Sequence, residues 1–233
     1  LKEHGITVLR DLPHLGRHLR DHVAAPVVWE THEEISGWQI CPFEATMMLQ
    51  LDRAAPAPDI LFHFGLRVRE KYDDNRLDTK GPAVKASPNV TRARSEGELR
   101  LSGPSMADKP VIELNYFAEP SDLDLLVEAM KLTRKLGQTK AMQALCRAEV
   151  HPGPAVQTDD EWRRYVRSVC ETVYHPCCTA GIGRVVTPEL KVMEVDGLFI
   201  ADASAFSSLI TVNINAAVMM VAEKAADCIV EAR

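Results

Sequence analysis

Hydrophobic residues recur at helical spacing in three stretches of the chain. The first stretch, residues 120–137, has acidic residues near its start and Gly137 at its end, so we predict a helix that Ser121 caps. The second stretch, residues 159–175, also opens with acidic residues. The third, residues 215–232, lies at the C-terminal end of the sequence. Each pattern is typical of an amphipathic helix.

Shorter apolar runs bounded by Pro, Gly and Asp predict strands. These runs lie at residues 6–12, 25–30, 37–43 and 59–68. Their composition is typical of antiparallel strands. Residues 90–102 predict a hairpin with Gly97 near its turn, and the polar residues 70–88, which Gly and Pro interrupt, predict an exposed loop.

One further run, GLFIADAS at residues 197–204, is apolar until Asp202. This pattern predicts a buried strand whose carboxyl end reaches a binding site, as in open α/β sheets. A strand that is apolar on both faces needs neighbouring parallel strands. The sequence has no GxGxxG turn and no second βαβ unit, so we expect the edge of a nucleotide-binding domain without its centre.

Charge and composition limit the partners. The net charge of -6 at pH 7 argues against a nucleic acid or an anionic membrane surface. No apolar run approaches the ~20 residues that a membrane-spanning helix needs. The first residues, LKEHGITVLRDL, resemble neither a signal peptide nor a transit peptide. We therefore expect a cytoplasmic protein.

Residues 174–183, YHPCCTAGIG, place His175 beside two adjacent cysteines in a Gly-rich turn. Such a turn suits a metal site, a thiol redox pair or a catalytic histidine. The six cysteines form no two CxxC pairs and no histidine follows at zinc-finger spacing, so we expect no metal site. A disulfide between Cys177 and Cys178 would strain the peptide that joins them, so we expect reduced thiols.

Seven stretches follow one another along the chain: GITVLRDLPHLGRHLRDH, PNVTRARSEGELRL, DKPVIELNYFAEPSDLDLLVEAM, PGPAVQTDDEWRRYV, YHPCCTAGIG, GLFIADASAF and VNINAAVMMVAEKAADCI. In this order they resemble the C-terminal half of the glucose-methanol-choline (GMC) family of flavin oxidoreductases. The resemblance covers nearly the whole chain and is weakest at residues 30–85. PNVTRARSEG, FHFG and VNIN are most similar to the branch that holds choline oxidases and choline dehydrogenases.

The resemblance implies a mixed α+β and α/β fold. We expect an antiparallel-sheet substrate-binding domain at residues 23–155. Residues 1–22 and 156–233 are expected to belong to a Rossmann-like FAD domain, and the latter range would supply its C-terminal strand and helix. The N-terminal half of that FAD domain is missing from this chain, and we expect it as a separate polypeptide.

By the same resemblance, His175 corresponds to the catalytic histidine of the family's H-P-x-x-T motif. Histidine suits this role because it titrates near neutral pH and can accept the proton of an alcohol. Asn213 would donate a hydrogen bond to the developing alkoxide without titrating. The alternatives are a histidine that is merely hydrogen-bonded in a loop and an asparagine that caps the following helix.

Three residues would lie near the FAD: Asp202 and Ala203, which match a stretch that approaches the ribityl chain, and Asn215. Asp202 alternatively caps the turn that follows it. His63 matches a histidine of the substrate pocket, or it is a hydrogen-bonded residue of the core. Gln39 stands where we align a glutamate that pairs with the ammonium of choline, so another primary alcohol suits this chain at least as well as choline.

Two departures from the family pattern fall in the Gly-rich turn, where Cys178 replaces a glycine and Gly181 replaces a basic residue. If that glycine requires a positive φ, Cys178 is strained. Taken together, the resemblance implies an FAD-dependent enzyme that oxidises a primary alcohol to an aldehyde, present here as its C-terminal half. The alternatives are a non-catalytic partner subunit that keeps the half-fold and a metal or thiol-redox protein.

Overall fold

The computed structural model describes residues 1–35, 45–66 and 77–231, and the chain forms two compact units. Unit 1 consists of Leu1–His22, Ala93–Glu119 and Tyr174–Arg233, and unit 2 of Val23–Arg92 and Pro120–Val173. Each unit therefore collects segments that are far apart in the sequence. The assignment of an FAD-binding role to residues 1–22 and 156–233, and of a substrate-binding role to 23–155, remains a prediction.

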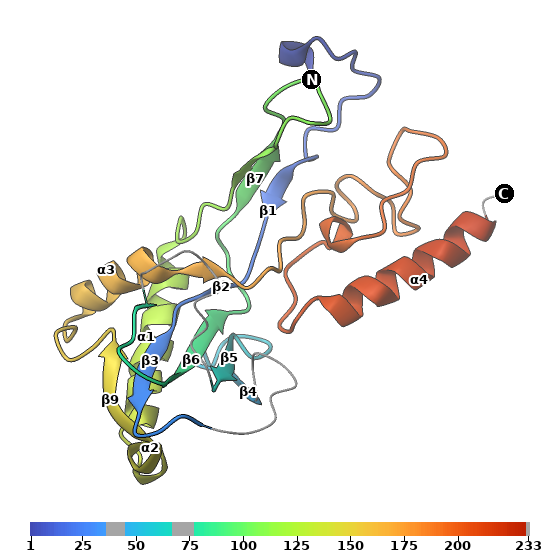
Figure 1. Ribbon diagram of the computed structural model, residues 1–233. Coiled ribbons are helices and arrows are strands. Elements are labelled where there is room, and N and C mark those ends of the chain that lie inside the picture. The colour runs from blue at the N-terminus through green and yellow to red at the C-terminus, as the bar shows by residue number, and fades with distance from the viewer. Residues whose placement is uncertain (36–44, 67–76, 232–233) are drawn as a thin grey trace. The chain divides into compact units, whose positions relative to one another are not determined.

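Unit 2 contains a seven-stranded sheet with antiparallel pairing (Figure 1). Its strands are β2 (Val23–Ala24), β3 (Val27–Thr31), β4 (Ala45–Leu49), β5 (Ile60–Gly65), β6 (Ala83–Val90), β9 (Cys146–His151) and β10 (Glu171–Thr172). The path runs β10-β2-β6-β3-β9, and β5 pairs with both β6 and β4. The predicted strands at 25–30 and 59–68 are thus present, whereas the one at 37–43 lies outside the described residues.

The register of the sheet sorts apolar side chains onto one face. Val27 and Phe64 both pair with Ala86, and Phe62 pairs with Pro88, so these side chains share a face. The helix α1 (Pro120–Gly137) runs alongside β3 and β6 in Figure 1. Its buried residues are Asp122, Leu123, Leu126, Val127, Ala129, Met130 and Thr133. Their helical spacing explains why this helix was predictable from the sequence.

The ends of the predicted helices differ from expectation. Helix α1 begins at Pro120, so Ser121 lies within its first turn and does not precede it as a cap. A short helix α2 (Lys140–Leu145) follows. Helix α3 (Asp159–Val169) ends six residues before the predicted end because the chain then becomes extended and pairs with β2 as β10.

Unit 1 contains the three-stranded sheet β1-β7-β8, the 3-10 turns η1 (Lys2–His4) and η3 (Ala203–Ala205), and the helix α4 (Asn215–Glu231). The strands are β1 (Arg17–Leu19), β7 (Gly97–Arg100) and β8 (Val111–Glu113). The hairpin predicted at residues 90–102 is wrong. Val90 ends β6, and Gly97 opens β7, which pairs with β1 and β8.

Three further predictions are corrected. Residues 6–12 and 197–204 form no regular strand in the described structure, and only one isolated bridge, Lys191 with Phe199, involves the latter run. An apolar run becomes a strand only when a neighbouring segment pairs with it over several residues, and in the described chain neither run forms such a ladder. Residues 83–88, expected in a loop, belong to β6.

Helix α4 is sparsely covered in unit 1. Ala225 is its one residue classed as buried, while Met219, Met220 and Val230 are 55%, 65% and 69% exposed. Three exposed large apolar side chains on one helix are characteristic of a surface that packs against another element. No helix in the described parts of the chain is both long and apolar enough to cross a bilayer.

Candidate functional site

The Gly-rich turn at residues 174–183 is fixed by backbone hydrogen bonds to two other segments of unit 1. On one side, Gly16 N–H donates to Thr179 O, and Arg20 and Cys177 exchange N–H to O bonds. On the other side, three N–H groups of the turn donate to carbonyl oxygens of η3: Cys178 to Ala203, Ala180 to Ser204 and Ile182 to Ala205. All six distances are 2.8 to 3.2 Å. The turn is therefore anchored on one side by residues 16–20 and on the other by η3. This network of hydrogen bonds holds the backbone around His175 in a fixed position.

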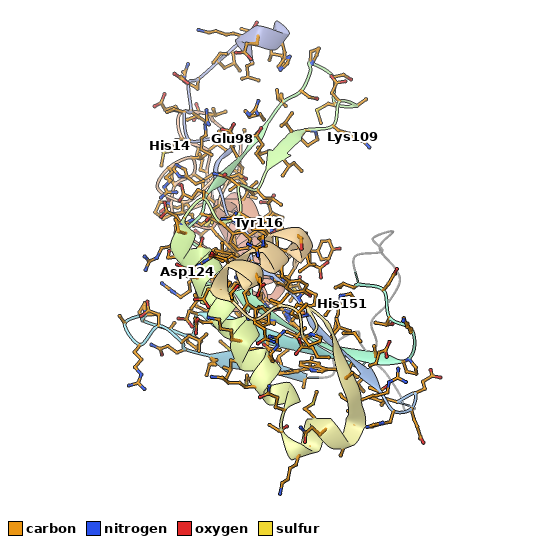
Figure 2. The ribbon with its side chains drawn as sticks, turned by 90° about the vertical axis from the view of Figure 1, so that its left-hand side faces the viewer. His14, Glu98, Lys109, Tyr116, Asp124 and His151 are labelled. Carbon is orange, nitrogen blue, oxygen red and sulfur yellow. The ribbon has the colours of Figure 1, made fainter. Side chains whose placement is uncertain are left out.

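His175 is held through both its backbone and its ring. Its backbone N–H donates to Asp21 Oδ1 at 3.0 Å. The other oxygen of that carboxylate accepts from Tyr116 Oη at 2.6 Å, and Tyr116 is labelled in Figure 2. The ring Nδ1 atoms of His22 and His175 lie 2.9 Å apart, and the rings meet edge to face at 89°.

The partners of His175 are deeply buried. His22 has no exposed surface and Asp21 is 3% exposed. His22 Nε2 lies 2.8 Å from the carbonyl oxygen of Ile210. Sequence reasoning missed Asp21, His22 and Tyr116 as site residues, although the DH pair at 21–22 lay within a stretch that carried the family resemblance.

Asn213 and Asn215 lie at the start of α4. Asn215 is the first residue of the helix, Asn213 precedes it by two positions, and both side chains are exposed. Asn213 follows Ile210 by three positions, and the carbonyl of Ile210 is hydrogen-bonded to His22. The ring of His22 also contacts the ring of His175, so His22 connects the two segments. The roles of Asn213 at the alkoxide and of Asn215 near the flavin remain predictions.

Asp202 caps η3, which is one of the two roles expected for it. Its Oδ1 accepts from Ser204 N–H at 2.7 Å and from Ser204 Oγ at 2.5 Å. The side chain is nevertheless exposed, and Ala203 is half-buried. The role of Asp202 near the ribityl chain of FAD remains a prediction.

The predicted substrate residues belong to unit 2. His63 lies on β5 and is 5% exposed, and its Nδ1 is 3.1 Å from the amide nitrogen of Asn89, as expected for a hydrogen-bonded core residue. This contact leaves its pocket-lining role a prediction. Gln39 lies outside the described residues.

Cys177 and Cys178 are both buried, with their sulfur atoms 3.2 Å apart. The hydrogen bond between the thiols lowers the pKa of Cys178, and Arg20 and Arg184 act in the same direction against its burial. The same hydrogen bond, together with burial, raises the pKa of Cys177. Cys178 has φ of 76°, so the strain expected from replacing a glycine there is present.

No metal centre emerges from the turn. Across residues 1–35, 45–66 and 77–231, no three or more His, Cys, Asp or Glu side chains are grouped so that they could hold a metal ion. The arrangement of His175 instead suits proton transfer, because a half-buried imidazole is held in one orientation by buried hydrogen-bonding partners.

Comparisons with known proteins show the family to which the chain belongs. The family model for GMC oxidoreductases matches residues 93–222. Choline oxidase from Arthrobacter globiformis is 38% identical over the full length of this chain, which covers 44% of that enzyme. The oxygen-dependent choline dehydrogenase of Sinorhizobium fredii is 34% identical over 97% of the chain, which covers 46% of that protein.

Solved structures share the fold. Pyridoxine 4-oxidase from Mesorbium loti superposes with a TM-score of 0.88 at 24% identity, over 97% of this chain and 45% of its own. A formate oxidase superposes with a TM-score of 0.87 at 22% identity, over 98% of this chain and 49% of its own.

The relatives and structural neighbours are FAD-dependent oxidoreductases. The chain spans about half the length of the curated relatives that it matches. Its mixed α/β fold with antiparallel sheets corresponds to the C-terminal part of those enzymes. The chain thus belongs to the GMC oxidoreductase family.

Proposed function

We propose that this chain is the C-terminal part of an FAD-dependent enzyme that oxidises a primary alcohol to an aldehyde. The observation that carries the proposal is the fixed orientation of His175, whose backbone is held by Asp21 and whose ring is held by His22. Asp21 and His22 are both buried, and the turn that carries His175 is itself anchored on two sides. A proton acceptor needs this order.

The chemistry divides between the chain and the cofactor. When bound, FAD supplies the hydride acceptor. His175 takes the hydroxyl proton of the substrate, and the Asn213 amide donates a hydrogen bond to the oxygen that becomes negative. Asp202, Ala203 and Asn215 are the residues of this chain that would contact the cofactor, and the exposed Asp202 and Asn215 are accessible to it.

The proposal also requires a second part of the protein. The sequence has no GxGxxG turn to hold the diphosphate of FAD, and the chain covers only 44% to 46% of its curated relatives. The exposed apolar residues of α4, Met219, Met220 and Val230, would pack against the dinucleotide-binding part. That part is either continuous with this chain or a separate polypeptide.

The substrate is proposed to be a small primary alcohol. Choline oxidase and choline dehydrogenases are among the relatives, which supports an alcohol as the substrate class. In our alignment Gln39 replaces the glutamate that pairs with a quaternary ammonium, and a neutral amide loses that charge pairing. An uncharged primary alcohol, such as one on a sugar, should therefore compete well with choline.

Replacing His175 with Ala in the complete flavoprotein tests the catalytic role. The variant should bind FAD normally, and its rate of flavin reduction by an alcohol should fall by about 100-fold or more, because positioned general bases contribute ~10²–10⁴-fold. Stopped-flow absorbance under anaerobic conditions measures this rate. An unchanged rate would show that His175 is not the base and would favour a non-catalytic partner subunit.

A further inference from the structure

We propose that His22 is a positioning residue that fixes His175 in the tautomer with a proton on Nδ1 and a lone pair on Nε2. The inference rests on the proposed function, because it assigns which nitrogen of His175 receives the substrate proton. It concerns two residues that lie 153 positions apart in the sequence and meet through their rings.

The hydrogen-bond chain begins at a group that can only accept. The carbonyl oxygen of Ile210 has no proton, so the 2.8 Å contact with His22 requires an N–H on His22 Nε2. A neutral imidazole carries only one N–H. The Nδ1 of neutral His22 therefore presents a lone pair.

The donor and acceptor of the hydrogen bond between the two rings follow from this assignment. His22 Nδ1 and His175 Nδ1 are 2.9 Å apart, and one proton must lie between them. Because His22 accepts, His175 donates from Nδ1. Its second nitrogen, Nε2, then carries the lone pair of the neutral ring and is the atom that can take a proton.

Burial makes this polarity persistent. His22 has no exposed surface, so water does not compete for its hydrogen bonds to Ile210 and His175. The preceding residue, Asp21, holds the backbone of His175, so two adjacent residues fix its main chain and its ring together. When Nε2 of His175 is protonated, its Nδ1–H can still donate to the lone pair on Nδ1 of His22, now as a stronger charge-assisted hydrogen bond.

Two substitutions at one position separate this role from simple packing. His22→Asn places an amide oxygen near the position of Nδ1 and keeps an acceptor for His175. His22→Phe keeps a ring of similar size and removes the acceptor. Both variants lose the imidazole, so a difference between them reports the hydrogen bond to His175.

The readout is the tautomer of His175, measured by long-range ¹H–¹⁵N NMR on the complete protein labelled at histidine. His175→Ala identifies the signal. We expect the Nδ1–H form in the wild type and in His22→Asn, and a mixture with the Nε2–H form in His22→Phe. The rate of flavin reduction by an alcohol should fall about tenfold or more in His22→Phe and substantially less in His22→Asn, since loss of a tautomer-fixing partner is costly in comparable sites.

An Nε2–H tautomer in the wild-type protein would overturn the inference directly, even if the His22→Phe variant failed to fold. Equal tautomer populations and equal rates in the two variants would overturn it as well. Failure of the proposed function looks different, because His175→Ala would then reduce flavin at the wild-type rate while the NMR tautomer of His175 still depended on His22.

Discussion

At Gly137 the end of α1 meets the indole of Trp29 so closely that there is no room for a methyl group. A Cβ atom at this position would overlap the indole Nε1 and the carbons beside it. Trp29 lies on β3 and is buried, so its ring has little freedom to move away. Packing against Trp29 thus requires a glycine at the end of the helix.

Gly137→Ala should therefore lower the free energy of unfolding by about 1–3 kcal/mol, the usual cost of overpacking. Helix propensity alone predicts the opposite, a gain of up to ~1 kcal/mol. Denaturant unfolding of the wild type and of Gly137→Ala shows whether the free energy of unfolding falls or rises. Gly81→Ala is the control, because no atom lies within 4 Å of a Cβ added there.

His175 can be proposed as a site residue from the sequence because its motif is contiguous in the chain. Its partners are not predictable in this way. Asp21 lies 154 positions away and His22 153, and no local pattern links them to the turn. For the same reason the sequence could offer two roles for Asp202, and the hydrogen bonds to Ser204 were needed to establish the capping role.

Helices were easier to predict than strands because the signals of a helix are local. Helix α1 follows from its apolar spacing, and α3 from its acidic first turn. A strand depends on a partner that the sequence does not name. Residues 6–12 and 197–204 have the composition of strands but find no ladder among the described residues.

The start of α3 is fixed by a capping box. Thr158 accepts from Glu161 N–H, and the Glu161 carboxylate accepts from Thr158 N–H at 2.8 Å. Thr158→Ala should cost about 1 kcal/mol of unfolding free energy, and Thr158→Ser should cost much less because it keeps the hydroxyl. Denaturant unfolding monitored by circular dichroism measures both. Equal losses for the two variants would show that the hydroxyl is not the stabilising group.

The segments around β1 and β7 are joined by ion pairs along a groove that His14 and Glu98 also line. His14 and Glu98 are both labelled in Figure 2. Glu96 accepts hydrogen bonds from Arg20 at 2.6 Å and from His18 at 2.7 Å. Burial alone would raise the pKa of Glu96, but the hydrogen bonds from Arg20 and His18 outweigh it and the net pKa is lowered.

A carboxylate with a lowered pKa in the folded state stabilises the fold above the pKa that it has in the unfolded chain. This contribution is lost as the pH falls through the lowered value. The free energy of unfolding should therefore decrease between neutral and acidic pH, and less steeply in Glu96→Gln. Denaturant unfolding across that range tests this, and identical pH slopes in both proteins would contradict it.

On the scale of the whole molecule, the chain belongs to the GMC oxidoreductase family and holds the turn that we propose to be catalytic, but its sequence has no GxGxxG turn to hold the diphosphate of FAD. We therefore expect the 233-residue chain alone to bind FAD weakly. Fluorescence titration with FAD measures this affinity.

The exposed apolar residues of α4 also predict that the isolated chain binds a hydrophobic dye more strongly than the complete protein does.

The most direct test of the account is a visible absorption spectrum of the complete protein, with each polypeptide identified by intact mass, before and after anaerobic addition of a primary alcohol. We predict a flavin band that requires the dinucleotide-binding part, bleaches with the alcohol, and bleaches far more slowly when His175 is replaced by Ala. Tight stoichiometric flavin on the 233-residue chain alone, or a colourless complete protein, would contradict the account.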